Sequence, residues 1–113
     1  MPYIHIHTNA SVPAEKAQAI KQKLGRAITA VPGKSEQWLM VEITDGAALY
    51  FQGSDAPAGI AEVSLYGNAS GNALDQLTGQ ITGILTEELT LPPDRVYVSY
   101  MTTPNWGWNG HNF

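Results

Sequence analysis

The sequence predicts an α+β fold in which two similar β-α-β halves form one four-stranded mixed sheet with two helices on one face. Four segments show the alternation typical of strands, and two intervening segments repeat apolar residues at helical steps. The triplet Asn-Ala-Ser precedes both helical segments, starting at Asn9 and at Asn68. Val41 and Val98 hold matching positions in later strands, so the chain looks like an internal duplication.

The first half is expected to open with a strand over residues 2–8. Its period of two places Ile4 and Ile6 on one face and His5 and His7 on the other. Met1 precedes this strand and Pro2 begins it.

A helix and a second strand complete the first half. Ser11 is expected to cap the helix, Pro13 to stand in its first turn, and Pro32-Gly33 to end it. Residues 38–43 then form the second strand. The apolar face of the helix comprises Ala17, Ile20, Leu24, Ala27, Ile28 and Val31.

The second half repeats this order after a loop rich in glycine and small residues. Strands are expected over residues 60–67 and 95–100, and Pro92-Pro93 ends the intervening helix. Right-handed crossovers make the two strands of each half parallel. The helix has an apolar stripe of Leu74, Leu77, Ile81, Ile84 and Leu85. We expect pseudo-repeats at about residues 2–44 and 60–101, within one domain that spans residues 1–113.

The sheet face opposite the helices has an unusual composition. It is expected to carry Tyr3, His5, His7, Trp38, Met40, Glu42, Glu62, Ser64, Tyr66, Tyr97, Ser99 and Met101. This set is too aromatic for a face in plain solvent and too polar for a dry core. The C-terminal segment 102–113 is also too aromatic for a free tail. We therefore expect a symmetric oligomer in which residues 102–113 pack on a neighbouring subunit.

Composition excludes several classes of function. The absence of cysteine excludes disulfides, thiolate nucleophiles and thiol redox motifs. The net charge is −4 and the six Lys and Arg residues are scattered, so nucleic acid is not an expected partner. No apolar run suits a membrane span and no secretory signal is visible, so we expect a cytoplasmic protein, with signal-independent export left open. No dinucleotide or phosphate fingerprint occurs, and we expect no cofactor.

His5 and His7 share one strand face at a spacing that can hold a metal ion. The sequence shows no third ligand cluster beside them, and His111 is isolated near the C-terminus. We therefore expect no metal site, and expect both histidines to line a channel or a surface. The triplets at Asn9 and Asn68 are interpreted as helix-capping turns rather than as glycosylation sites.

Four motifs occur in an order that is typical of one family. They are MPYIHIHTN at the N-terminus, GKSEQWLMVEI after the first helix, PPDRVYVSY at the last strand and WGWNGHNF at the C-terminus. Together they resemble the macrophage migration inhibitory factor family of the tautomerase superfamily. The resemblance runs almost end to end, and implies a homotrimer whose three sheets surround a central channel. It also implies active sites between subunits that interconvert the enol and keto forms of arylpyruvates such as phenylpyruvate.

By this resemblance Pro2 is the catalytic base, once removal of Met1 has made its nitrogen a free secondary amine. A free amino terminus has a reference pKa of about 8. Burial disfavours the charged form, and a base whose pKa lies near ambient pH transfers protons best. Without the resemblance, a proline at the start of a strand is the simpler interpretation. Lys34 matches the family lysine that pairs with the substrate carboxylate, and is otherwise a solvated lysine after the first helix.

Further residues are expected to form the pocket. Tyr97 matches a family tyrosine that lines the pocket from an adjacent subunit. Phe51, Trp106 and Trp108 are candidate apolar walls for an aromatic ring, or else packing residues between subunits. Tyr66 matches a position whose backbone contacts the substrate. An aliphatic residue is usual there, so a tyrosine could narrow the pocket.

Two departures from the family pattern leave alternatives open. Ser99 stands where asparagine is favoured, which puts a polar contact to the substrate in doubt. Ala58 to Ala61 replace a Cys-x-x-Cys segment, so thiol–disulfide chemistry is excluded. One alternative is a cytokine-like, protein-binding trimer with a weak or vestigial pocket. Another is a hydratase or dehalogenase of the same superfamily, although such members usually place several arginines in the pocket and this chain has only Arg26 and Arg95.

Overall fold

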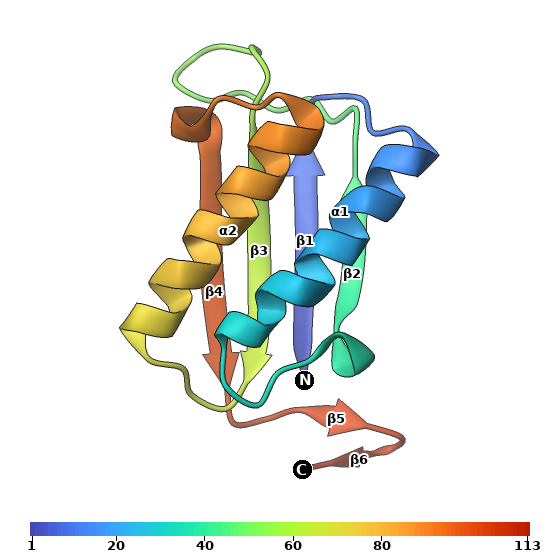
Figure 1. Cartoon of the computed structure of the whole chain (residues 1–113), viewed down its shortest axis with the longest axis vertical. Coiled ribbons are helices and arrows are strands. Elements are labelled where there is room, and N and C mark those ends of the chain that lie inside the picture. The colour runs from blue at the N-terminus through green and yellow to red at the C-terminus, as the bar shows by residue number, and fades with distance from the viewer.

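Two helices lie side by side on one face of a four-stranded sheet (Figure 1). The computed structural model describes residues 1–113. The strands are β1 Pro2–Thr8, β2 Met40–Thr44, β3 Gly59–Tyr66 and β4 Val96–Thr103, and the helices are α1 Ala14–Ala27 and α2 Gly71–Leu89. Short 3₁₀ helices occur at Ile28–Ala30, Glu36–Trp38 and Pro93–Arg95. Neither α1 nor α2 combines the length and the apolar character that crossing a membrane requires.

The strand order is β2-β1-β3-β4. Strands β1 and β2 are parallel, β3 and β4 are parallel, and the two central strands β1 and β3 are antiparallel. Each half is therefore a β-α-β unit, and the halves meet at the middle of the sheet. The predicted fold class, with its mixed sheet and its helices on one face, is confirmed.

The core lies between the helices and the sheet. Strand β1 alternates strictly, so that Ile4 and Ile6 are fully buried under the helices while His5 and His7 lie on the other face. The predicted apolar stripes of both helices meet these strand residues. The largest fully buried side chains are Ile4, Ile6, Ile20, Leu24, Ile28, Leu65, Leu77, Ile81, Leu85, Leu91, Val31 and Val63.

Two local predictions in the first half are wrong. The N-cap of α1 is Pro13, not Ser11, and no side chain caps the helix. The preceding segment is instead held by a hydrogen bond from the Val12 N–H to Asp45 Oδ2, at 2.8 Å. Trp38 lies in a 3₁₀ helix, so β2 begins only at Met40. In the second half the serine of the repeated triplet does cap its helix, because Ser70 Oγ accepts a hydrogen bond from the Ala73 N–H.

The C-terminal segment forms a small hairpin of β5 Gly107–Trp108 and β6 His111–Asn112. Its turn residues Asn109 and Gly110 have φ values of 54° and 85°, as a type I′ turn requires. The hairpin lies at the same end of the sheet as the N-terminus (Figure 1). The Asn-Gly pair was the sequence signal for this hairpin, which the aromatic content alone did not reveal. Its packing on a neighbouring subunit stays a prediction.

Candidate active site

The backbone of Tyr66 brings the N-terminus and Lys34 together. Pro2 opens β1, is buried, and pairs with Leu65 near the end of β3. The N–H of Tyr66 donates to the Met1 carbonyl oxygen at 3.1 Å. The carbonyl oxygen of the same residue accepts a hydrogen bond from Lys34 Nζ at 2.7 Å. The backbone of Tyr66 therefore holds Met1 on one side and Lys34 on the other, next to Leu65, with which Pro2 pairs.

The turn after the first helix determines where Lys34 lies. Gly33 has a φ of 82°, in the left-handed region that favours glycine. The Lys34 N–H then donates to the Val31 carbonyl oxygen at 3.1 Å, which closes the turn. The lysine side chain is half-buried, and its Nζ also lies 5.9 Å from the centre of the Tyr66 ring. Lys34 is thus held over the end of β3 and is not a freely solvated cation.

This environment disfavours positive charge at the amino terminus. Burial lowers the pKa of the Met1 α-amino group from 8.0 to about 6, and the charge of Lys34 and its hydrogen bond contribute to the same shift. An amine is therefore held neutral near physiological pH at the point where β1 begins.

A hollow of about 440 Å³ opens beside the N-terminus. Its walls come from the start of β1, the 3₁₀ helix before β2 and the C-terminal hairpin. They comprise Met1, Pro2, Tyr3, Gln37, Trp38, Leu39, Met40, Trp106, Gly107 and Trp108. The rings of Trp38 and Trp108 meet edge to face, with their centres 5.0 Å apart. The structure thus brings Trp106 and Trp108 to Pro2.

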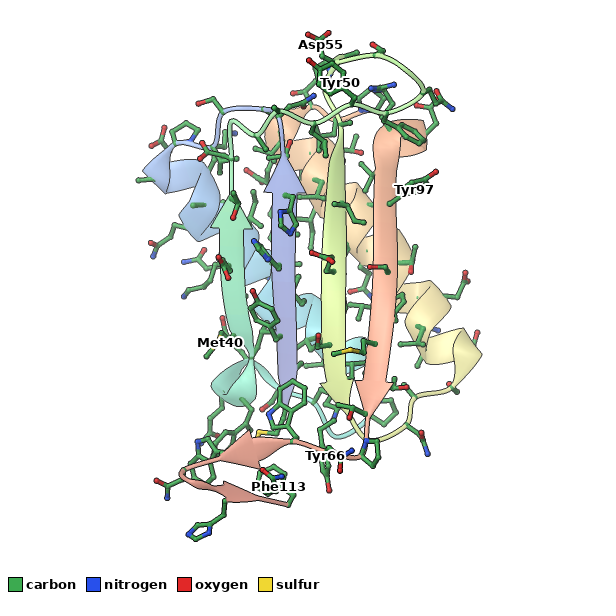
Figure 2. The ribbon with its side chains drawn as sticks, turned by 180° about the vertical axis from the view of Figure 1, so that it is seen from behind. Met40, Tyr50, Asp55, Tyr66, Tyr97 and Phe113 are labelled. Atoms are coloured by element: carbon green, nitrogen blue, oxygen red, sulfur yellow. The ribbon has the colours of Figure 1, made fainter.

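The last residue of the chain also contributes an aromatic ring at this end. Phe113 packs edge to face on Tyr66, with ring centres 5.2 Å apart (Figure 2). Its N–H donates to the Trp106 carbonyl oxygen, which ties the end of the chain to the hairpin. Phe113 and Trp38 are aromatic residues at this end that the sequence did not predict for the site. The only signal was the high aromatic content of their segments.

Tyr97 and Phe51 lie at the opposite end of the sheet. Their rings meet edge to face at 4.8 Å. Tyr97 pairs with Ile60 on β3, whereas Pro2 pairs with Leu65 on that strand. Five residues of strand separate these positions by about 17 Å, at about 3.3 Å per residue. Figure 2 accordingly shows Tyr97 and Tyr66 at opposite ends of the sheet.

Ser99 occupies neither end. It pairs with Glu62 in the middle of the sheet and is exposed. Within one chain, the predicted site residues therefore form two groups at opposite ends of the sheet, with Ser99 between them. The second group consists of Tyr97 and Phe51. The first group comprises Pro2, Lys34, Tyr66, Trp106 and Trp108.

The loop that carries Phe51 is held by two long-range anchors. The Asn9 side-chain amide donates to the carbonyl oxygens of Leu49, Asp55 and Ala56, and its oxygen accepts from the Ala58 N–H. The interpretation of Asn9 as part of a helix-capping turn is therefore wrong. The side chain instead satisfies backbone groups of the irregular loop that carries Phe51.

Arg95 is the second anchor. Its guanidinium donates to the carbonyl oxygens of Phe51, Ser54, Ala56 and Pro57, at 3.0 to 3.2 Å. The guanidinium carbon also lies 5.3 Å from the centre of the Phe51 ring. Arg95 therefore fixes Phe51 against Tyr97.

Replacing Arg95 by methionine should lower the free energy of unfolding by about 1–3 kcal/mol, since four carbonyl oxygens lose a charged donor. Hydrogen exchange should speed up mainly over residues 45–58, because the rest of the fold does not depend on this side chain. Arg26→Met, on the exposed face of α1, is the matched control and should change neither quantity. Equal effects of the two substitutions in denaturant melts would contradict the assignment of Arg95 as the loop anchor.

His5 and His7 do have a third candidate metal ligand beside them, contrary to the expectation from the sequence. Glu62 of β3 supplies a third ligand group next to His5 and His7, and the candidate ligand atoms of the three residues lie within 4.8 Å of one another. The sequence could not show this, because the antiparallel register of β1 and β3 brings Glu62 opposite His5.

Comparisons with known proteins agree with the fold. The family model described as macrophage migration inhibitory factor matches residues 1–113. The mouse protein of that name is 30% identical over 118 residues, covering 100% of this chain and 99% of the mouse protein. The crystal structure of Leishmania major MIF2 is 31% identical with a TM-score of 0.94, covering 100% of this chain and 97% of that one. A homologue from Prochlorococcus marinus is 27% identical with a TM-score of 0.83, and 98% of each chain is covered.

Proposed function

Because this chain belongs to the macrophage migration inhibitory factor family of the tautomerase superfamily, we propose that it is a cofactor-free keto–enol tautomerase of phenylpyruvate type. The observation that carries the proposal is the junction at Tyr66. There the buried Pro2 and the cation of Lys34 converge on one backbone segment beside an aromatic hollow. A base, a carboxylate anchor and an apolar wall are the groups that an arylpyruvate requires.

Pro2 acts as the base after Met1 has been removed. While Met1 is attached, the Pro2 nitrogen is an amide without a basic lone pair. Its removal creates a secondary amine in an environment that already lowers the pKa of the Met1 α-amino group to about 6. The neutral amine takes a proton from the enol hydroxyl and delivers it to the other carbon of the C=C bond, beyond the one that becomes the carbonyl, or the reverse, so no net proton is consumed.

Removal of Met1 also frees a hydrogen-bond donor. The Tyr66 N–H that now donates to the Met1 carbonyl oxygen loses its partner beside the new amine. An oxygen atom of the substrate can replace that carbonyl oxygen. Removal of Met1 thus frees the Tyr66 N–H and creates the Pro2 amine in one step, which links processing to substrate binding.

Lys34 binds the carboxylate of the substrate. Its positive charge also stabilises the negative charge that develops on the enolate oxygen. The same charge keeps the neighbouring amine deprotonated. The edge of the hollow formed by Trp106 and Trp108 accepts the aromatic ring of the substrate.

A homotrimer completes the pocket in this proposal. Tyr97 and Phe51 are far from Pro2 within one chain, so they reach the substrate only from a neighbouring subunit. The exposed face of the sheet supports association, since Met40, Tyr97 and Met101 are 67%, 59% and 59% exposed. In the proposed trimer these side chains become covered.

A hydratase or dehalogenase is a weaker proposal. That chemistry usually draws on several arginines near the base. Arg95 uses its guanidinium on four loop carbonyl oxygens, and Arg26 lies on the exposed side of α1. Neither arginine lines the hollow around Pro2.

The pH dependence of phenylpyruvate ketonisation tests the proposal. The protein should be assayed after intact mass measurement has confirmed the loss of Met1. The value of kcat/KM should rise with pH up to the pKa of the Pro2 amine and then level off, because only the neutral amine is a base. In Lys34→Gln a nearby positive charge is lost, the pKa of the amine rises, and the rising limb should move to higher pH by roughly one unit. KM should increase about 10- to 100-fold through loss of the carboxylate anchor.

Lys21→Gln is the matched control, since Lys21 is exposed on α1 away from the hollow. It should leave both the pH profile and KM unchanged. Processed wild-type protein that does not accelerate ketonisation would refute the proposed function. An unshifted pH profile in Lys34→Gln would refute the electrostatic role of Lys34.

A further inference from the structure

The face of the sheet opposite the helices carries a cluster of three metal-ligating side chains. His5 and His7 are two residues apart on β1 and therefore lie on the same face. Glu62, on the neighbouring strand β3, pairs with His5 in the antiparallel register. His7 Nε2 and Glu62 Oε1 are 2.7 Å apart, and the candidate ligand atoms of all three residues lie within 4.8 Å of one another.

The surroundings of this cluster favour a cation. None of the four strands of the sheet contains a lysine or an arginine, although the chain has six such residues. A second carboxylate, that of Glu42 on β2, has an oxygen atom 3.6 Å from His5 Nε2. Two carboxylates therefore face two imidazoles with no basic side chain from the sheet to neutralise them.

The cluster is held in place and is open to solvent. The side chains of His5 and His7 are 18% and 30% exposed, and that of Glu62 is 55% exposed. The two imidazole rings are in close contact and tilted, with centres 3.7 Å apart and planes inclined by 36°. All three residues project from paired strands, which are a more rigid support than loops.

The distances suit a small transition-metal ion. Tetrahedral zinc takes nitrogen and oxygen ligands at about 2.0–2.2 Å, so the ligand atoms are about 3.3–3.6 Å from one another. The candidate ligand atoms lie within 4.8 Å of one another, so no pair exceeds this spacing by more than about 1.5 Å. His5 Nε2, which is 2.9 Å from Thr44 Oγ1, would exchange that hydrogen bond for the metal.

We propose that His5, His7 and Glu62 form a binding site for a divalent transition-metal ion such as Zn²⁺. Two imidazoles and one carboxylate are a known three-ligand set for zinc, with the fourth position open to water. Imidazole ligands select Zn²⁺, Cu²⁺ or Ni²⁺ over Mg²⁺ and Ca²⁺. All three ligands come from one chain, so the site does not depend on the proposed trimer or on the tautomerase reaction.

The test uses full-length protein without an affinity tag, titrated with Zn²⁺ by calorimetry. One ion per chain should bind. His7→Gln and Glu62→Gln should each weaken binding by at least about tenfold, since even the loss of a group that only supports a ligand commonly costs 10- to 100-fold. His111→Gln removes an exposed histidine of the C-terminal hairpin and is the matched control, with unchanged affinity.

A second measurement on unmodified protein avoids reliance on the variants. Co²⁺ in place of Zn²⁺ should give visible absorption of a four-coordinate ion and paramagnetically shifted proton signals from two imidazoles. Zn²⁺ should also raise the melting temperature, because it binds the folded state. The proposal fails if no ion binds at millimolar concentration, if His7→Gln and Glu62→Gln bind as wild type does, or if only His111→Gln loses binding.

Discussion

Replacing Pro2 by glycine should reduce kcat/KM for phenylpyruvate ketonisation about 100-fold or more, within the range by which a positioned acid–base group accelerates proton transfer. Glycine still provides an α-amino group after Met1 is removed. It lacks the ring that is buried at the start of β1, opposite Leu65, so the amine is no longer held in one position. Steady-state kinetics on protein of verified mass measure the effect.

A second variant isolates the chemistry of the nitrogen. Insertion of one alanine before Pro2 leaves the proline ring in the chain but makes its nitrogen an amide. This variant should be at least as inactive as Pro2→Gly. Pro13→Gly makes the same substitution at the exposed N-cap of α1 and should retain wild-type kinetics. Unimpaired catalysis by the alanine-insertion variant would exclude Pro2 as the base.

Mixing two inactive variants should restore activity if neighbouring subunits share each pocket. Pro2→Gly loses the base, and Tyr97→Ala loses the aromatic side chain at the opposite end of the sheet. In trimers reassembled from a 1:1 mixture, a site is intact when a chain with Pro2 adjoins a chain with Tyr97. Random cyclic assembly makes this true for about one quarter of the sites, so about one quarter of wild-type activity should return.

The control for this experiment is a mixture of Pro2→Gly with Lys34→Ala. Pro2 and Lys34 lie at the same end of the same chain, since Pro2 pairs with Leu65 and Lys34 binds the neighbouring Tyr66. No arrangement of these two variants gives an intact site, so this mixture should stay inactive. Restoration in the control, or none with Tyr97→Ala, would contradict a pocket shared as proposed. Native mass spectrometry would verify that mixed trimers have formed.

Much of the fold could be predicted because local patterns agree with the tertiary structure. The alternation in β1 correctly assigned Ile4 and Ile6 to the core and the histidines to the other face. The helical stripes correctly assigned residues such as Leu24 and Ile81 to the interior. Burial of one face is the main constraint on a strand or a helix, and period alone reveals that face.

The errors occurred where long-range contacts decide the structure. Asn9 resembles a capping residue in its triplet, yet its side chain holds a loop about forty residues later in the chain. Ser11 was expected to cap α1, but the segment is fixed by Asp45. Short polar side chains satisfy whichever backbone groups the fold brings to them, and sequence proximity does not identify those groups.

The sequence by itself determined the α+β class, the two parallel pairs, the core and the family resemblance that pointed to Pro2 and Lys34. Those features follow from periodicity and from motifs read within a few residues. Only the tertiary structure decided that the backbone of Tyr66 joins Lys34 to the N-terminus, and that Tyr97 lies at the far end of the same sheet. It also placed Glu62 beside His5 and His7. The pairing register between strands sets these neighbours, and it arises only when the whole sheet forms.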